Sequence, residues 1–519
     1  MKALQTDLRR RVPAPPGKRF HHVFKPAGRV LPGRLALPAM LFFLALLVLP
    51  NALAATAREA AKDRPHVVIL FVDDMGYGDP RSFNPDSKIP TPEIDRLAEQ
   101  GMRFNDAHAP GALCHPSRYG LLTGHYPFRA DPEAWRERPV IEEGRLTIAS
   151  LLREQGYYTA MVGKWHLGFD ESGGYAAPMP GGPIDRGFDR FFGIRASTDI
   201  PPYFYIEGDT AVDPPTDAID DNTSEGWSPI QGAFWRGGKI APDLELIDVL
   251  PRFTDEAVQI VREHAADRPN EPLLLYLALP APHTPWLPTE PYEGASGADM
   301  YGDFMAMVDA KIGDVLDALD ETGMADDALV IFTSDNGPVW YDEDTERFDH
   351  DSQGGLRGMK GDAYEGGHRI PLIARWPGRI APRQVTNQTI SFTDLLATFA
   401  DITGASLSDD GAEDSFSILP VLLGEQPEAE PVRPPVISTS LTGMRAVQQG
   451  RWKLIEGLGS GGFTQPRHID PGPEDPPGQL YDLHNDLAET NNLWHEHPGI
   501  VQRLQRVLEE ADRTGRTRH

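Results

Sequence analysis

The sequence predicts an α/β fold: a large central mixed, mostly parallel sheet flanked by helices, then a small C-terminal subdomain with an antiparallel sheet and a helix. Two observations carry this prediction. Apolar runs typical of strands buried on both faces alternate with helical stretches, and beyond residue 431 short alternating segments replace them. The 519 residues also exceed the ~250–300 at which a single core stops growing, which favours one large unit and a smaller one.

Three apolar runs predict strands of the central sheet, and each ends in a cluster of polar residues. The runs span 66–72, 272–279 and 328–333, and the clusters are Asp73-Asp74, Pro282-His283-Thr284-Pro285 and Ser334-Asp335-Asn336-Gly337. Helices are expected at 92–100 and 304–319. Ligands of parallel sheets bind beyond the carboxyl ends of the strands, so we expect the three clusters to share one site.

The domain organisation follows from local composition. A Pro- and Glu-rich stretch at 424–435 is typical of a linker, which predicts a large α/β domain over residues 55–430 and a C-terminal subdomain over 431–519. Two stretches rich in Gly, Pro and Asp, 175–183 and 209–239, are expected to be surface loops near the site.

The C-terminal subdomain has the pattern of a hairpin and a helix. Apolar segments at 444–447 and 452–455 flank Gln449-Gly450, which predicts two antiparallel strands joined by a turn. Residues 500–511 predict a terminal helix.

Residues 1–54 have the pattern of a signal peptide. A segment with nine Lys and Arg precedes an apolar run at 35–49, and the small residues Ala52-Leu53-Ala54 form an A-x-A cleavage site. We therefore expect an exported protein, periplasmic or extracellular, without stable membrane insertion. An uncleaved anchor is the alternative, because the run extended to Ala55 approaches the ~20 residues that a membrane span needs.

The charge of the chain limits its partners. The net charge is −28, and removal of residues 1–54, with nine positive charges and one negative, changes it to −36. Such an anionic body excludes nucleic acid as a partner, since binding it needs a basic surface. An anionic substrate would need positive charge concentrated locally. Only seven lysines follow residue 54, and two of them, Lys164 and Lys360, lie in the motifs described below.

The chain has a single cysteine, Cys114, so it forms no internal disulfide. A lone thiol in an exported protein is either incidental or chemically used. Cys114 begins the segment Cys114-His115-Pro116-Ser117-Arg118. Pro116 fits the first turn of a helix, which places Cys114 at a helix N-terminus, where negative charge is favoured, and Arg118 on the same helical face.

This segment, C-H-P-S-R, resembles the C-x-P-S-R signature of the type I sulfatases, the arylsulfatase-like members of the alkaline phosphatase superfamily. The resemblance extends through further motifs in the expected order over nearly the whole chain after residue 54. It implies that residues 55–430 form the catalytic domain of a sulfuric ester hydrolase. It also implies that a formylglycine-generating maturation enzyme oxidises Cys114 to formylglycine (3-oxoalanine).

Four polar residues at two predicted strand ends point to a metal site. Asp73, Asp74, Asp335 and Asn336 offer carboxylate and amide oxygens, which suit calcium or magnesium and not zinc. Taken alone, Asp73-Asp74 also fits a solvent-exposed turn that binds no metal. The resemblance implies that these four residues bind one Ca²⁺ and that the modified residue 114 completes the site.

The remaining motifs supply candidate catalytic residues. Lys164 and His166 lie in G-K-W-H-L-G, and in an extended segment they would point to the same side. His283 lies between prolines just past a strand, and Lys360 lies in G-M-K-G-D-A-Y-E-G-G. The resemblance implies that Arg118, Lys164 and Lys360 offset charge on the sulfate, that His283 protonates the leaving alcohol, and that His166 accepts a proton from the hydrated aldehyde.

Substrate-binding residues are less evident. Ser197 and Asp199 match a substrate-side position of the family more weakly, and Trp340, His350 and Arg357 are candidates for the pocket wall. The expected substrate is a sulfated carbohydrate or an aryl sulfate ester. Three other functions stay open: a phosphate or phosphonate ester hydrolase of the same superfamily, a catalytically silent protein that binds sulfated glycans, and a metal-binding scaffold in which Cys114 is unmodified.

Overall fold

The computed structural model describes residues 64–518. The predicted signal peptide therefore lies outside the described residues. Among the helices that are described, none combines the length and the apolar character that crossing a membrane requires.

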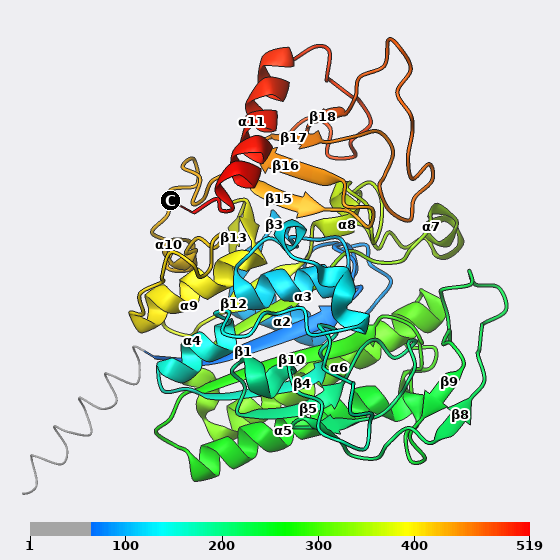
Figure 1. The fold of residues 1–519 in the computed structure, drawn as a ribbon, viewed down its shortest axis with the longest axis vertical. Coiled ribbons are helices and arrows are strands. Elements are labelled where there is room, and N and C mark those ends of the chain that lie inside the picture. Colours follow the sequence, from blue (N-terminus) through cyan, green and yellow to red (C-terminus); the bar gives the residue numbers. More distant parts are fainter. Residues whose placement is uncertain (1–63, 519) are drawn as a thin grey trace, which may run out of the picture. The chain divides into compact units, whose positions relative to one another are not determined.

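The core of the fold is a ten-stranded sheet in the order β13-β2-β12-β11-β1-β10-β4-β5-β6-β7 (Figure 1). Its strands, in chain order, are β1 His66–Asp73, β2 Met102–Phe104, β4 Tyr158–Lys164, β5 Arg190–Ile194, β6 Ile206–Glu207, β7 Thr210–Ala211, β10 Leu273–Pro282, β11 Ala328–Ser334, β12 Leu372–Arg375 and β13 Gln384–Thr386. Two short pairs lie beside it: β3 Ala107–His108 with β14 Ile390–Ser391, and β8 Asp217–Ile219 with β9 Gly238–Ile240.

The middle of this sheet is parallel. β1 lies between β11 and β10, β4 follows β10, and β5 follows β4, all in parallel. The register aligns Val72 of β1 with Ser334 of β11 and Asp73 with Pro282 of β10. The carboxyl ends of these strands therefore meet at one edge. β12 and β6 pair antiparallel on the two sides, so the sheet is mixed and mostly parallel, as predicted.

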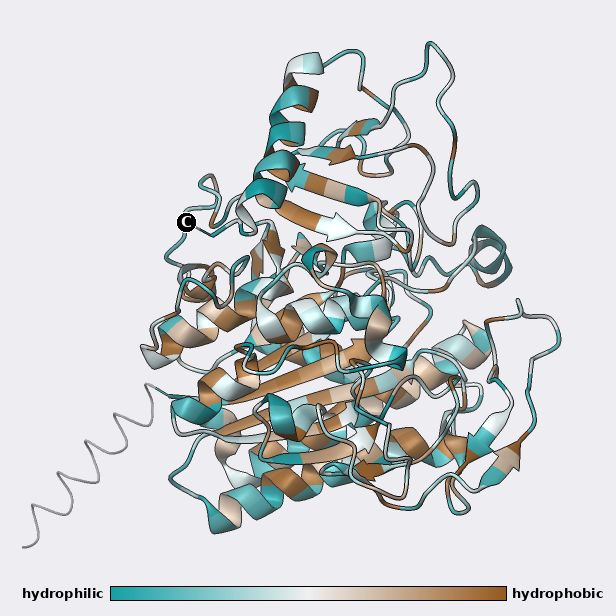
Figure 2. Cartoon of the chain, in the orientation of Figure 1, coloured by the Kyte–Doolittle hydropathy of each residue, from teal (hydrophilic) through white to brown (hydrophobic). Residues whose placement is uncertain are grey.

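The parallel strands are buried along nearly their whole length, which requires cover on both faces. Figure 2 shows them as a band of hydrophobic residues, while the helices α5 and α11 carry both hydrophobic and hydrophilic segments. The helices are α2 Pro92–Gln100, α3 Cys114–Thr123, α4 Ile148–Glu154, α5 Val249–Asp267, α6 Asp299–Thr322, α7 Asp342–Phe348, α8 Glu365–His368, α9 Leu395–Thr403, α10 Leu419–Leu422 and α11 Pro498–Thr514. α6 contacts both α2 and α5, and α3, α4 and α9 contact one another in a second group.

The elements agree with the predicted ones in type, and their bounds differ at some ends. The helix at 92–100 is confirmed at both ends, whereas α6 begins five residues before the predicted 304 and ends three after 319. The stretch 209–239, predicted as a loop, contains the short strands β7 and β8 and the start of β9. These strands are only two or three residues long, and the Gly, Pro and Asp residues around them give the stretch the composition of a loop.

The C-terminal part is a four-stranded antiparallel sheet with α11 packed on it, which confirms the predicted architecture. Its strands are β15 Val436–Thr439, β16 Arg445–Gln449, β17 Trp452–Ile455 and β18 Gln479–Asp482. Tyr126, Ile437, Leu454 and Leu504 share its apolar core, so a residue of the large domain belongs to it. The division at 430/431 stays a prediction.

Candidate functional site

The polar clusters of the four central parallel strands meet at the carboxyl edge of the sheet. Asp73 ends β1 and Asp74 follows it, while Asp335 and Asn336 follow the neighbouring strand β11. Asn336 Nδ2 donates to Asp74 Oδ1 at 2.7 Å, and the backbone N–H of Asp74 donates to Asp335 Oδ1 at 3.2 Å. The predicted proximity of these residues therefore holds, because two adjacent parallel strands in register deliver their ends to one place.

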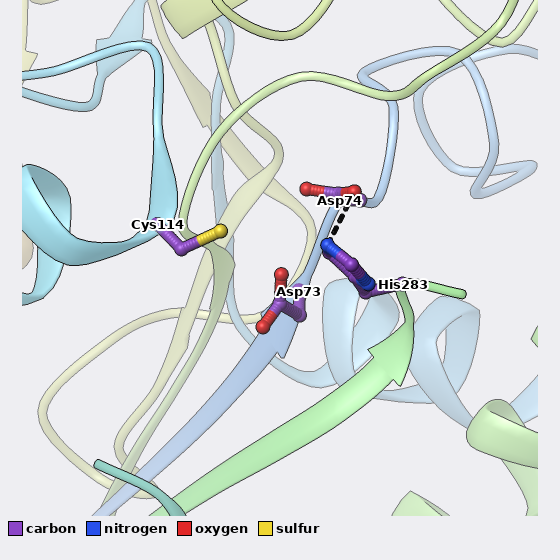
Figure 3. A group of neighbouring side chains, drawn as sticks. All are labelled: Asp73, Asp74, Cys114 and His283. Carbon is purple, nitrogen blue, oxygen red and sulfur yellow. Dashed lines mark ion pairs between the residues drawn. The ribbon is translucent and has the colours of Figure 1, made fainter. Parts of the chain in front are cut away.

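Cys114 is the first residue of α3, as the position of Pro116 predicted. Its helix is buried throughout, and no side chain caps its N-terminus. Figure 3 shows the Cys114 sulfur directed toward the Asp73 and Asp74 carboxylates at the end of β1, with His283 from β10 opposite. One ligand atom from each of these four residues lies within 4.8 Å of the others.

The environment of Cys114 disfavours a thiolate. Burial, together with the Asp73 carboxylate, raises the pKa of the Cys114 thiol to about 12. Reactive cysteines act as thiolates of lowered pKa. An unmodified Cys114 in these surroundings is therefore a poor nucleophile at neutral pH.

Asp73 accepts hydrogen bonds from two cations. Its Oδ2 accepts from Arg118 Nη2 at 2.8 Å and from Lys164 Nζ, and Arg118 Nη2 also donates to Asp335 Oδ2 at 2.9 Å. Burial would raise the pKa of Asp73, but Lys164 and Arg118 hold it well below its usual range. Burial and the Asp73 charge raise the pKa of Asp335 to about 7. The two carboxyls thus differ in their readiness to hold a proton.

Lys360 and His283 approach the site through Asp74. Lys360 Nζ lies 2.6 Å from Asp74 Oδ1, and although burial would lower its pKa, this carboxylate raises it. His283 Nε2 lies 3.7 Å from Asp74 Oδ2, marked by the dashed line in Figure 3. His283 Nδ1 lies 2.8 Å from the Thr284 carbonyl, so Nδ1 carries a hydrogen and Nε2 faces the site.

The residues at this edge fit a hard divalent cation. Asp73 Oδ1 and Asn336 Oδ1 are buried oxygens without a hydrogen-bond partner, which is costly unless another group satisfies them. Carboxylate and amide oxygens are the ligands of Ca²⁺ and Mg²⁺. His283 belongs to the compact ligand group with Asp73, Asp74 and Cys114, and Asp335 does not. The Asp335 oxygens accept from Arg118 and from the Asp74 backbone N–H.

Two site residues hold unusual backbone conformations. Asp74 has φ 66° and His166 has φ 59°, in the left-handed region that residues other than glycine rarely adopt. Such strain gathers at functional sites because the surroundings must hold it. It also corrects one expectation: β4 ends at Lys164, so the segment to His166 is not extended and the shared-side argument from alternation fails.

His166 is an imidazole held by packing. Both its ring nitrogens are buried without a hydrogen-bond partner, and the ring packs edge-on against Trp135 at 4.3 Å between centroids. Burial, with the nearby Lys164 charge, holds the pKa of His166 well below its usual range. His166 is thus a neutral imidazole with free acceptor capacity beside Lys164.

A pocket opens over the site, and its wall includes residues that sequence reasoning missed. Asp74, His283, Lys360 and Asp199 line the pocket, together with Ile230, Phe234, Arg236, Pro282, Thr284, Trp286, Tyr301, Val339 and Phe463. The loop at 209–239 was expected near the site, but nothing in its pattern distinguished Phe234 and Arg236. Phe463 comes from the C-terminal part of the chain.

The five candidate substrate-binding residues divide into two groups. Asp199 lines the pocket, and Ser197 is buried two residues before it in the chain. Among the described residues, the Oγ of Ser197 and the Oδ1 of Asp199 have no hydrogen-bond partner. Trp340, His350 and Arg357 are not among the residues that line the pocket.

These three side chains are engaged elsewhere. Trp340 Nε1 donates to the His350 carbonyl at 3.0 Å, and His350 Nε2 lies 2.9 Å from Asp79 Oδ1. Arg357 donates to Tyr481 Oη at 3.4 Å and stacks over Tyr364. All three lie close in sequence to Asn336 or Lys360. The side chains of Trp340 and His350 are buried in the protein, whereas Arg357 is exposed and held by its contacts with Tyr364 and Tyr481.

Comparisons with known proteins agree with this geometry. A family profile described as Sulfatase matches residues 65–405. An N-acetylgalactosamine-6-O-sulfatase of Bacteroides thetaiotaomicron is 33% identical, over 86% of this chain and 93% of that protein. Human arylsulfatase A is also 33% identical, over 88% of this chain and 89% of its own length.

The solved structures lead to the same family. A sulfatase structure described in connection with glycosaminoglycan metabolism by Bacteroides thetaiotaomicron has a TM-score of 0.75 and 32% identity, covering 86% of this chain and 99% of that one. A phosphonate monoester hydrolase of Agrobacterium radiobacter, 18% identical with a TM-score of 0.57, shows the shared fold alone. The chain therefore belongs to the sulfatase family as a type I sulfatase of the alkaline phosphatase superfamily, and it is a sulfuric ester hydrolase.

Proposed function

We propose that this sulfatase removes sulfate from a sulfated carbohydrate, or from an aryl sulfate, with a formylglycine made from Cys114 and one calcium ion. The observation that carries the proposal is the position of the only cysteine. It begins a buried helix within 4.8 Å of the Asp73, Asp74 and His283 ligand atoms, where a thiol has a raised pKa. These surroundings disfavour a thiolate, which supports a modified residue 114 as the nucleophile.

The metal would be held by Asp73, Asp74, Asp335 and Asn336 together with residue 114. Unpartnered buried oxygens on Asp73 and Asn336 support this ligand set. The hydrated formylglycine would supply the attacking oxygen, and calcium the positive charge that lowers the pKa of that oxygen and binds the sulfate. A maturation enzyme that generates formylglycine is the partner that this modification requires.

Three cations are available to the sulfate oxygens. Arg118, Lys164 and Lys360 are buried and now pair with the Asp73, Asp74 and Asp335 carboxylates. Positively charged groups that are already in place before the reaction, in a site with little water, strongly stabilise the negative charge that develops in the transition state. We assign these three side chains to the oxygens of the sulfuryl group.

The two histidines divide the proton transfers. His283 lines the pocket with Nε2 facing inward, so in its protonated form it can give a proton to the departing alcohol. His166 is buried and neutral, with both ring nitrogens unpartnered, so it can accept the proton whose loss releases sulfate. Asp199, in the pocket wall, and the nearby buried Ser197 are proposed to contact the substrate.

The test is the Cys114→Ser variant together with intact-mass analysis of the wild type. A serine can attack once, but its sulfate ester lacks the second hydroxyl that releases sulfate. We expect multiple turnover of a sulfate ester to fall by orders of magnitude and the wild-type mass to show formylglycine. Near-normal turnover in the serine variant, or an unmodified thiol in active protein, would refute the mechanism.

The same preparation separates the rival functions. Wild-type kcat/KM for a sulfate ester is compared with that for the matching phosphate ester. A preference for phosphate would favour the related ester hydrolases, and binding without turnover of any ester would favour a silent glycan-binding protein. We propose in addition that the protein is exported and acts in the periplasm or outside the cell, which fractionation of cells producing the full chain would show.

A further inference from the structure

Arg136 is an exposed arginine without an ion pair, although acidic residues outnumber basic ones in the chain. Its guanidinium stacks over the Trp135 ring at 4.3 Å from the centroid. Within residues 64–518, no hydrogen bond or ion pair joins it to another side chain; Arg138, two residues on, pairs with Asp131 at 3.0 Å. The Arg136 charge is therefore left free toward solvent.

Two more arginines interact with this charge: Arg195 shares the Trp135 ring with Arg136, and Arg236 repels Arg136 electrostatically from the pocket wall. Arg195 lies over the same Trp135 ring at 5.5 Å, and its Nε donates to Glu171 at 2.6 Å. Arg236 lines the active-site pocket, and its side chain is 51% exposed although it pairs with Asp199. Burial, followed by the like charges of Arg195 and Arg236, lowers the pKa of Arg136. Arg195 and Arg236 already pair with Glu171 and Asp199, so Arg136 is the member of this group whose charge is left for a bound anion.

The arginine group adjoins the catalytic residues on two sides. Trp135, beneath Arg136 and Arg195, contacts the His166 ring at 4.3 Å between centroids. Asp199, the partner of Arg236, lies 4.0 Å from His283 Nδ1 through its Oδ1. An anionic group bound at Arg136 and Arg236 would thus lie beside the position of the sulfate ester and not replace it.

We propose that Arg136 and Arg236 form a second anion-binding subsite, which selects an acidic carbohydrate carrying a further carboxylate or sulfate next to the ester that is cleaved. Guanidinium groups bind both kinds of anion through paired hydrogen bonds. Local positive charge also attracts a polyanion to a protein that otherwise repels it. The proposal rests on the proposed sulfatase function and narrows its substrate, since a plain aryl sulfate offers nothing to this subsite.

The first experiment compares two substrates that differ only in the second anion: N-acetylgalactosamine 6-sulfate, and the disaccharide in which a uronic acid is attached to it. We expect Arg136→Gln to lower the ratio of kcat/KM for the disaccharide to kcat/KM for the monosaccharide about tenfold, through KM. Arg236→Gln should act in the same direction. Arg138→Gln, from the same segment and already paired with Asp131, should keep the wild-type ratio.

A third substrate, N-acetylgalactosamine 4,6-disulfate, distinguishes the two anions. If its ratio to the monosulfate falls in Arg136→Gln, the subsite takes a sulfate; if only the disaccharide ratio falls, it takes a carboxylate. Unchanged ratios for both substrates in Arg136→Gln and Arg236→Gln overturn the proposal. So does an equal fall for monosaccharide and acidic substrates, because Arg136 then only supports Trp135.

Binding separates this proposal from the sulfatase mechanism. Calorimetry with the Cys114→Ala protein and calcium measures the affinity for the same disaccharide without turnover. Weaker binding on adding Arg136→Gln supports the subsite even if the wild type hydrolyses no ester, in which case only the proposed function fails. Equal affinity with and without Arg136→Gln overturns the subsite even if the sulfatase chemistry is confirmed.

Discussion

At the scale of single residues, the candidate site is a set of buried charged and polar side chains whose hydrogen-bonding groups are only partly paired with one another. Asp73 accepts from Arg118 and Lys164, and Asp74 from Lys360, yet oxygens of Asp73 and Asn336 have no partner. A buried oxygen without a partner costs free energy. A cation bound to these oxygens of Asp73 and Asn336 should therefore stabilise the folded protein, in addition to its proposed role in the reaction.

Removal of calcium should therefore lower both activity and thermal stability. A ligand at 100 times its Kd stabilises the folded state by about 2.7 kcal/mol. We expect EGTA to lower Tm by a few degrees and to abolish turnover, and excess Ca²⁺ to restore both. Calorimetric scans of the protein with and without the chelator measure this. An unchanged Tm after complete removal of bound calcium would contradict the metal site.

Another buried cationic side chain, Lys453, has a role away from the candidate site. Its Nζ lies 2.9 Å from Glu365 and from Glu489, and 3.1 Å from His368 Nε2. His108, Glu365 and His368 could hold a metal by geometry alone, but the Lys453 ammonium already lies against two of them. Burial raises the pKa of Glu489 to about 7, while Lys453 keeps the pKa of Glu365 far below its usual value.

Lys453→Met should be strongly destabilising. It leaves two carboxylates buried without their cation, and breaking a buried pair costs about 3–5 kcal/mol. Denaturant unfolding measures the loss. Lys311→Met, which removes a partly exposed pair with Asp314 at 2.7 Å, is the matched control and should cost less than about 1 kcal/mol. Adding Glu489→Gln to Lys453→Met should recover part of the lost free energy of unfolding. If Lys453→Met lowers the free energy of unfolding no more than the Lys311→Met control does, this account is contradicted.

At the scale of elements, α2 shows how distant residues complete local structure. Its N-cap residue, Thr91, makes no capping hydrogen bond. Instead Asp309 of α6, 216 residues after Glu93, accepts the backbone N–H groups of Glu93 and Ile94 at 3.1 and 2.9 Å. The helix bounds were predictable from the local pattern, whereas the carboxylate that satisfies the first turn comes from another helix.

Asp309 should make stability depend on pH near neutrality. Burial raises its pKa from 3.8 to about 7, against the two backbone hydrogen bonds, which lower it. Between about pH 4 and pH 7 the folded protein therefore binds a proton that the unfolded chain has lost, so the Asp309 contribution to stability falls as pH rises. The free energy of unfolding of wild type minus that of Asp309→Asn should decrease from about pH 5 to pH 7 and then level off. A difference independent of pH would show that Asp309 does not titrate in this range.

At the scale of the whole molecule, the C-terminal part of the chain supports two loops of the candidate site, the one before Cys114 and the one around Lys360. Thr439 of β15 accepts the Ala112 N–H at 2.8 Å, two residues before Cys114. Leu441 donates to the Gly361 carbonyl at 2.7 Å, next to Lys360, and Ala363 donates to Ser460 at 2.7 Å. Asp394 accepts two hydrogen bonds from Arg433 at 2.7 Å in a buried ion pair. The subdomain is thus part of the active-site framework.

Cleavage of the linker should leave the enzyme assembled. Residues 427–431 are exposed, and the chain on either side is held by the buried contacts of β15 and Arg433. A protease site placed at 427–430 and cut in the folded protein should give two fragments that elute together and keep most of the turnover. Separation of the fragments under native conditions, or loss of activity on cutting, would contradict this. The uncut protein with the same insertion is the control.

The candidate site was predictable where a motif is local and unpredictable where it depends on loop packing. Asp73, Asn336 and Lys164 follow directly from strand ends, so the parallel order of the strands brings them together. Arg236 and Phe463 reach the pocket from segments whose patterns indicate only loops. Trp340, His350 and Arg357 lie in the right segments, but their direction depends on partners such as Asp79 and Glu489, which lie far away in the sequence.

By itself, the sequence determined the α/β architecture, the position of the single cysteine at the start of a helix, and the Asp and Asn residues at the ends of strands. These features follow from short-range periodicity and composition. Only the tertiary structure decided the left-handed conformations of Asp74 and His166 and the lack of hydrogen-bond partners for oxygens of Asp73 and Asn336. It also decided the placement of arginines around Trp135 and the contacts of the C-terminal part with the loops before Cys114 and around Lys360. Those features arise where segments far apart in the chain pack together, and side-chain direction there is decided by contacts that no local pattern contains.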